Sequence, residues 1–468
     1  MKVHENYQLD VAGYLIVRNA LAAEDVKRFV ARLDRGDDDA RAELCEHPTL
    51  ASYVEELCGV NYALSGTPGL LPPATEQDGQ CCGGHEPLDW ALAYQRQGDV
   101  RFCQSLVVVW ALTDVAADDG GFILVPASHK SQVGAPRQLR EGDDAMGIVE
   151  QPILEAGDLL LCVGATLRGT RPWRGVGPQR LFTCIFVGEE VRRFSTPAVE
   201  EPSPWMHELT PEQRAVLGAG AVVPSGGRHH PSIYRRDPDC GIDADEFFLW
   251  DLQGYLILPG VMDADWIAAA DAAIEANADR LTGGHKPPGN TARLDGTPLS
   301  SMRGLFELPA PHAEPFRRMI AHAPVMQRLT WMLGGGFRLG HVRAMCYEPG
   351  SCGLFMHGGS EPANSRNHYT LQNGRSFCES VNVAWQLVDV GPSDGGFVCI
   401  PGSHKARYRL PDELVTLDEE LGLVRHIEAR AGDVILFMGA AQTHGAYPWA
   451  GPVTRKVALL NYKSPNRA

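Results

Sequence analysis

The sequence contains two tandem copies of one pattern, and this repeat constrains the fold more than any other feature. The segment FCQSLVVVWALTDVAADDGGFILVPASHK from Phe102 matches FCESVNVAWQLVDVGPSDGGFVCIPGSHK from Phe377 at an offset of 275 residues. The segments AGDLLLCVGA from Ala156 and AGDVILFMGA from Ala431 keep that offset. Runs of apolar and β-branched residues within these blocks end at Asp, Gly and Pro, as is typical of strands. Each copy is therefore predicted to contain a strand-rich barrel or sandwich.

A helical part precedes each predicted barrel. The segment around Gly13, LDVAGYLIV, matches LWDLQGYLIL around Gly254, and each is followed by an acidic helix start and by apolar residues three and four apart. We expect a mainly β fold with flanking helices, built as two modules at 1–235 and 241–468. At 468 residues, the chain is long enough for each module to bury its own core.

The second copy contains an insertion. The offset at the first block is only 241 residues, so the second copy carries 34 more residues before its barrel, roughly at 280–315. This stretch is rich in Gly and Pro. Such an insertion is typical of a lid or substrate-binding loop, and a plain surface loop explains it equally well.

Charge and composition limit the partners of the chain. The formal net charge is −16, which argues against a nucleic acid or an anionic membrane as partner because both select for basic surfaces. The start, MKVHENYQLD, lacks the basic and apolar regions of a secretory signal. We expect a cytoplasmic protein whose cysteines are free thiols.

Three polar residues of the second copy stand at the ends of predicted strands. His357 ends an apolar strand in FMHGG, His444 follows the strand GDVILFMGA, and Arg455 precedes the strand KVALLNY eleven residues later. Two imidazoles suit a borderline metal such as Fe(II), and a barrel arginine is a fixed two-pronged donor for a carboxylate. A keto-acid cosubstrate requires this combination of metal and carboxylate anchor.

Both halves resemble the phytanoyl-CoA dioxygenase family of Fe(II)/2-oxoglutarate-dependent oxygenases. The resemblance rests on the opening GYLIL, the strand VNVAWQLVDV, the segment DGGFVCIPGSHK, the late histidine in THG and the arginine eleven residues after it. It implies a double-stranded β-helix, a jelly-roll or cupin-like fold, in each half. It also implies a site for Fe(II), 2-oxoglutarate, O₂ and a small-molecule substrate.

Carried over by position, the resemblance assigns four residues of the second copy. His357 and His444 become the iron ligands, and Arg455 becomes the partner of the 2-oxoglutarate C5 carboxylate. Trp385 matches an aromatic position near the cosubstrate. Arg303 in the insertion, and Arg366 and Tyr369 between His357 and the next strand, are candidates for binding the substrate, although a solvated loop explains them equally well.

The chain departs from the family pattern at the third iron ligand. Where the family has HxD, this chain has His357 followed by two glycines, so Gly359 replaces the carboxylate. In relatives that halogenate, a small residue at this position lets chloride bind the iron. Glu361 is the nearest carboxylate, but Glu86 stands at the matching place in the first copy, which favours a scaffold role for Glu361.

The first copy has lost the histidines. In the repeat register Cys82 stands opposite His357, and Arg168 stands opposite His444 once one gap is allowed. We therefore expect the first module to bind no iron.

Three functions remain in competition after this comparison. The first is hydroxylation or a related oxidation of a small molecule, which is the family default. The second is halogenation, which Gly359 favours. The third is a catalytically inactive binding or scaffold protein, or another metal enzyme on the same barrel. We expect either a monomer whose two copies pack as an internal pseudo-dimer, or a homodimer.

Overall fold

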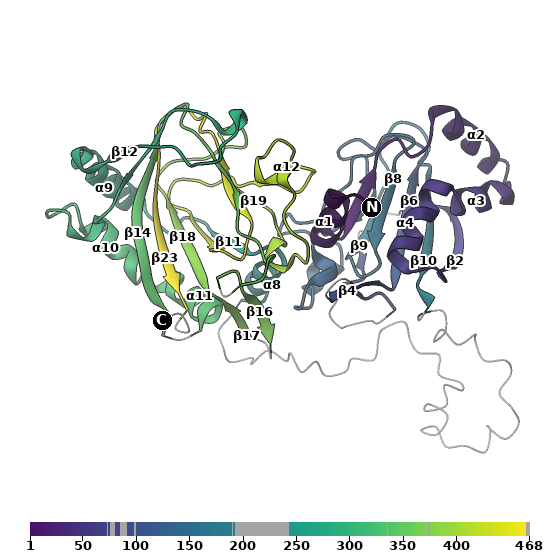
Figure 1. Cartoon of the computed structure of the whole chain (residues 1–468), viewed down its shortest axis with the longest axis horizontal. Coiled ribbons are helices and arrows are strands. Elements are labelled where there is room, and N and C mark those ends of the chain that lie inside the picture. The colour runs from purple at the N-terminus through teal and green to yellow at the C-terminus, as the bar shows by residue number, and fades with distance from the viewer. Residues whose placement is uncertain are drawn as a thin grey trace, which may run out of the picture. The chain divides into compact units, whose positions relative to one another are not determined.

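The computed structural model describes residues 1–464 apart from 73, 75–79, 85–90, 98–99, 190, 192–242, 335, 365 and 373–374. The described residues form two compact units (Figure 1), the first beginning at Gly13 and the second containing residues 243–464. The N-terminal helix α1 (Val3–Ala12) groups with the second unit, where Asp10 Oδ2 accepts a hydrogen bond of 2.8 Å from the Arg407 backbone amide. This differs from the expected module 1–235. The expected boundary near 240 lies outside the described residues.

The second unit is built on two antiparallel sheets. The larger has seven strands in the order β11 (Tyr255–Leu258), β21 (Val434–Met438), β18 (Ser380–Gln386), β23 (Arg455–Lys463), β14 (Arg338–Tyr347), β13 (Leu299–Met302) and β12 (Thr282–His285). The smaller has the order β15 (Leu354–His357), β22 (His444–Tyr447), β19 (Gly396–Cys399) and β20 (Arg425–His426). A separate hairpin joins β16 (Tyr369–Gln372) to β17 (Arg375–Cys378).

The larger sheet of the second unit has one face toward helices and one toward the smaller sheet. Helices α9 (Ala264–Glu275), α10 (Glu314–Ile320) and α11 (Ala323–Leu333) pack on the first face (Figure 1), in a core that includes Trp266 and Phe316. The second face forms a smaller cluster with the four-stranded sheet, including Ala384, Cys399 and Val457. We call the space between the two sheets the interior. Helices α8 (Ala244–Gln253) and α12 (Asp412–Val415) complete the unit.

The insertion at 280–315 extends the larger sheet. It forms the edge strand β12 and its neighbour β13, and β13 pairs with β14 through Ser301 and Met345. Leu294 and Met302 within it are fully buried. The insertion is therefore not a plain surface loop, because it pairs with the sheet and buries apolar side chains.

The first unit repeats this strand order. Its five-stranded sheet runs β1 (Tyr14–Val17), β8 (Leu159–Val163), β6 (Ser105–Ala111), β10 (Leu181–Val187) and β2 (Ala63–Leu70). A smaller sheet runs β3 (Cys81–Cys82), β9 (Arg168–Arg171) and β7 (Gly121–Leu124), and β4 (Tyr94–Gln97) pairs with β5 (Val100–Cys103). The helices are α2 (Ala23–Leu33), α3 (Asp38–Cys45), α4 (Pro48–Cys58) and α5 (Arg137–Arg140). The larger sheet corresponds to β11, β21, β18, β23 and β14, which is the order that a duplicated module would have.

The expected fold class, mainly β with flanking helices, is confirmed. Within the described ranges, no helix is long and apolar enough to cross a bilayer. The cysteines in those ranges are free thiols, as expected, and most are buried.

Candidate active site

His357 and His444 face each other in the smaller sheet of the second unit. The strand register pairs them directly, and their ring centroids are 4.3 Å apart. Each Nδ1 lies near the backbone carbonyl two residues earlier, at 3.1 Å for His357 to Phe355 and 2.9 Å for His444 to Gln442. A carbonyl only accepts, so each Nδ1 carries the proton and each Nε2 keeps a free lone pair.

The surroundings keep both imidazoles neutral. Burial lowers the pKa of His357 below its ordinary value. Burial, together with a smaller effect of the neighbouring His357, lowers the pKa of His444 to about 3. The neutral ring is the form that binds a metal ion, so the pair is a preformed two-nitrogen donor set at neutral pH.

Arg455 is a buried cation in the same interior. Its side chain is 5% exposed, its guanidinium carbon lies 5.1 Å from the centre of the Tyr347 ring, and its Nε has no hydrogen-bond partner. Burial lowers the pKa of Arg455, yet an arginine remains protonated in proteins. A buried guanidinium without a carboxylate partner is costly, which favours a site for an anionic ligand.

The smaller sheet relates Arg455 to the histidines. A Cβ built on Gly396 of β19 would lie 3.5 Å from the Arg455 guanidinium carbon. Three residues further along β19, Cys399 pairs with His444. At about 3.3 Å per residue, the guanidinium and the imidazoles are separated by roughly 10 Å along the strand.

Gln386 is a further polar residue of the interior that the sequence analysis missed. Its side chain is fully buried, and neither amide atom has a hydrogen-bond partner. Side chains alternate along β18, so Gln386 shares the interior face with Ala384. The register of the first unit puts Ala111 at this position. A comparison of the two copies for polar residues in buried strands would have found it.

The second position after His357 has a backbone conformation and surroundings that favour glycine. Gly359 has φ +104°, and a Cβ on it would lie 2.8 Å from the Thr443 hydroxyl oxygen. In the described ranges of the chain, no group of three His, Cys, Asp or Glu residues could hold a metal ion. Glu361 therefore does not complete a ligand set with the two histidines.

We expect Gly359→Asp to destabilise the chain. The positive φ and the contact with Thr443 together predict a loss of about 2–4 kcal/mol in the free energy of unfolding, measured by urea denaturation of the metal-free protein. Gly289→Asp is the control, because Gly289 has φ +90° and nothing within 4 Å of its added Cβ, so we expect a loss of about 1 kcal/mol. A Gly359→Asp protein with unchanged stability and tighter Fe(II) binding would contradict this expectation.

A protein-family model matches the part of the chain that contains this site. The model is described as phytanoyl-CoA dioxygenase (PhyH), and the match covers residues 355–457. The family expected from the sequence is thus confirmed for this part of the second unit, which includes both histidines, Gln386 and Arg455.

Known proteins similar to the chain include the ectoine dioxygenase of Stutzerimonas stutzeri (strain A1501). The two are 24% identical over 181 residues, which is 38% of this chain and 56% of the relative, so the chain spans little more than half of the relative's length. Among solved structures, HygX from Streptomyces hygroscopicus, with nickel, 2-oxoglutarate and hygromycin B bound, is 20% identical with a TM-score of 0.40, covering 48% of this chain and 88% of HygX. AviO1 from Streptomyces viridochromogenes Tue57 is 18% identical with a TM-score of 0.34, and the match covers 46% of this chain and 92% of AviO1.

Trp385 lies away from His357 and His444. It is fully buried on the helix-covered face of β18, with its ring centre 5.4 Å from that of Trp266 in α9. It pairs with Ala458, whose side chain points to the opposite face of β23 from that of Arg455. The expectation that Trp385 lies beside the cosubstrate is therefore wrong, because strand alternation turns it toward the helices.

The three candidates for substrate binding differ in their surroundings. The Tyr369 hydroxyl donates a hydrogen bond of 2.9 Å to Asp251, and its ring lies 4.8 Å from that of His404, so it belongs to a buried polar cluster and not to an open pocket. Arg366 is exposed in the turn after the histidine strand. Arg303 is exposed at the end of β13, among other basic residues.

The first unit carries different residues at the histidine positions. The register of β3 and β9 pairs Cys82 with Arg168, as β15 and β22 pair His357 with His444. Arg168 Nη1 donates hydrogen bonds of 2.6 and 3.2 Å to the backbone carbonyls of Gly164 and Thr166. The repeat alignment of the sequence also placed Cys82 opposite His357 and Arg168 opposite His444. Glu86, the proposed counterpart of Glu361, lies outside the described residues.

The counterpart of Arg455 in the first unit is Gln179. A Cβ on Gly121 would lie 3.5 Å from Gln179 Nε2, just as a Cβ on Gly396 would lie 3.5 Å from Arg455. The first unit therefore lacks the cation as well as both imidazoles at the matching positions.

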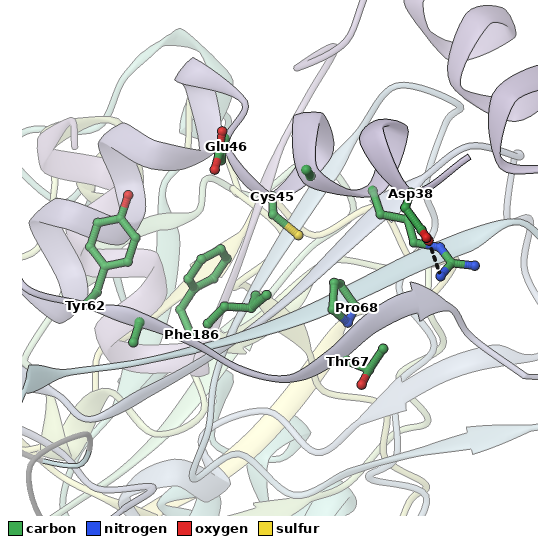
Figure 2. Close-up of a pocket in the computed structure, with 11 residues that line it drawn as sticks. Asp38, Cys45, Glu46, Tyr62, Thr67, Pro68 and Phe186 are labelled. Carbon is green, nitrogen blue, oxygen red and sulfur yellow. Dashed lines mark hydrogen bonds and ion pairs between the residues drawn. The ribbon is translucent and has the colours of Figure 1, made fainter. Parts of the chain in front are cut away.

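A pocket of about 500 Å³ also lies in the first unit (Figure 2), between α3 and β2. Its walls include Cys45, Tyr62 and Phe186, and the Asp38 carboxylate on its rim pairs with Arg41 at 2.9 Å. None of its lining residues is a histidine. It belongs to the unit without the histidine pair, and we assign it no function.

Proposed function

We propose that the second unit is an Fe(II)- and 2-oxoglutarate-dependent oxygenase that hydroxylates, or otherwise oxidises, a small molecule with O₂. The observation that carries this proposal is the pair of facing neutral imidazoles, His357 and His444, in the same interior as Arg455, whose buried Nε has no acceptor among the described residues. The phytanoyl-CoA dioxygenase match over this segment supports it, and so does the name of the related ectoine dioxygenase.

The residues fit iron and a keto acid. His357 and His444 would hold the metal through their free Nε2 atoms. Arg455 would bind the far carboxylate of 2-oxoglutarate through its guanidinium, and roughly 10 Å along β19 separates it from the imidazoles. The buried amide of Gln386 offers a donor and an acceptor that now lack partners.

The chain itself positions the reactants and excludes water. When bound, iron and 2-oxoglutarate supply the oxidising chemistry with O₂. The backbone carbonyls of Phe355 and Gln442 hold both rings in one tautomer. The Phe437 ring lies 4.9 Å from the His444 ring, and Phe397 lies 6.1 Å away, so apolar groups line this side of the site. These fixed contacts orient the ligands before the reaction begins.

Halogenation is the second candidate function. It is favoured by Gly359, which leaves only two protein ligands and whose φ of +104° disfavours any side chain. Chloride would then take the position that a carboxylate occupies in a hydroxylase.

The test is an anaerobic titration of the full chain with Fe(II) and 2-oxoglutarate. We expect a metal-to-ligand charge-transfer absorbance that saturates at one equivalent per chain. A change of this band with added chloride would favour halogenation, and an unchanged band would favour hydroxylation. Absence of the band would refute the oxygenase proposal and leave a binding or scaffold protein as the better account.

A further inference from the structure

Four basic side chains gather at one end of strands β13, β14 and β23. His341 and Arg343 belong to β14, Lys463 ends β23, and Arg303 directly follows β13. Burial lowers the pKa of His341, and the charges of Arg343, Lys463 and Arg303 lower it further. The four groups therefore lie close enough to act on one another. We call these four residues the basic rim.

The basic rim borders the interior of the second unit. Side chains alternate along β14, so Arg343 lies on the same face as Met345, which packs between the two sheets. The same alternation along β23 puts Lys463 on the face of Val457. Both cations thus extend the face of the larger sheet that looks toward the histidines.

A row of neighbouring residues connects the basic rim with the histidine site. A Cβ on Gly340 of β14 would lie 2.9 Å from Asn461 Oδ1. Asn461 pairs with Asn382, and Asn382 pairs with Phe437, whose ring centre is 4.9 Å from that of His444. The row crosses three strand spacings, which puts the basic rim about 15 Å from Phe437.

The basic rim has no acidic partner. In the described part of the chain, none of its four side chains makes a hydrogen bond or an ion pair, and Arg343 Nε is buried without an acceptor. The chain as a whole carries a net charge of −16, so a cluster of unpaired cations runs against its composition. Neighbouring like charges repel, and an anion placed among them would remove that repulsion.

We propose that the basic rim binds an anionic group of the substrate, a phosphate or a carboxylate. The guanidinium of Arg343 gives a planar two-pronged donor, and Lys463 adds a point charge beside it. That the bound molecule is also oxidised rests on the proposed function. On that basis, the row of strands sets the separation between the anionic group and the carbon that reacts at roughly 15 Å.

The test measures anion binding to the metal-free full chain by calorimetry. It uses phenyl phosphate and benzoate as probes, in the Arg455→Met background so that the 2-oxoglutarate anchor does not contribute. We expect one probe to bind at one equivalent per chain, and at least tenfold weaker binding after Arg343→Gln or Lys463→Gln. The probe that binds more tightly identifies the substrate group as a phosphate or as a carboxylate.

The control is Arg430→Gln, which removes one positive charge from an exposed position in the turn before β21, three strands away from β14. We expect this variant to bind the probe within twofold of the background. No saturable binding, or equal binding by all three variants, would overturn the proposal. The calorimetry uses metal-free protein, so it measures anion binding independently of iron binding. Failure of this proposal can therefore be distinguished from failure of the oxygenase proposal, which the charge-transfer titration tests.

Discussion

We expect His444→Ala to abolish the Fe(II)/2-oxoglutarate absorbance and to weaken Fe(II) binding at least about 100-fold. Loss of a residue that merely orients a metal ligand typically costs 10- to 100-fold in affinity, so loss of one of only two protein ligands should cost no less. The change removes a buried imidazole whose pKa is lowered to about 3, so the wild-type ring needs no deprotonation before it binds the metal. Anaerobic competition with a chromophoric chelator measures the affinity.

The matched control for His444→Ala is His426→Ala in the same sheet. His426 stacks on Tyr447 with its ring centre 4.9 Å away, and its side chain is 36% exposed. We expect His426→Ala to bind Fe(II) within twofold of wild type. Equal loss of iron in both variants, or retention of iron by His444→Ala, would contradict the assignment of His444 as a ligand. Thermal unfolding of each variant shows whether the fold is retained.

The repeat was sufficient to predict where the strands of each copy lie. The candidate site came instead from the histidines at strand ends, and the structure brings His357 and His444 together in one register pair. Histidines at strand ends can be recognised in sequence because the turn signals that follow them mark where each strand stops. The family resemblance then connected these residues with Arg455.

Side-chain direction was the part that the sequence could not provide. Whether Trp385 points toward the helices or into the interior depends on strand register, and a shift of one residue reverses the answer. The insertion was expected to be a lid, a substrate-binding loop or a plain surface loop, because its Gly and Pro content hid the two short strands β12 and β13. Gln386 was missed because a single glutamine in an apolar strand carries no signal until the matching Ala111 is placed beside it.

We expect Arg455→Met to weaken 2-oxoglutarate binding about 100-fold or more, while Fe(II) affinity stays within about twofold. Charge-assisted hydrogen bonds to a buried carboxylate are worth several kcal/mol, and breaking such a pair typically costs 2–5 kcal/mol. Methionine keeps a side chain of similar length but removes every donor. Titration of 2-oxoglutarate into the anaerobic Fe(II)-loaded variant, followed by the charge-transfer absorbance, measures the change.

The same variant separates a binding role of Arg455 from a structural one. In the metal-free protein, the guanidinium is buried without a carboxylate partner, and replacing such a charge with an apolar side chain is often neutral or stabilising. We therefore expect the unfolding midpoint of metal-free Arg455→Met to equal or exceed that of wild type. Arg455→Lys keeps the charge but loses the two-pronged geometry, so its 2-oxoglutarate affinity should lie between those of wild type and Arg455→Met. A lower midpoint together with unchanged 2-oxoglutarate affinity would show that Arg455 serves the fold. An equal or higher midpoint together with weaker 2-oxoglutarate affinity would show that Arg455 serves ligand binding at the expense of stability.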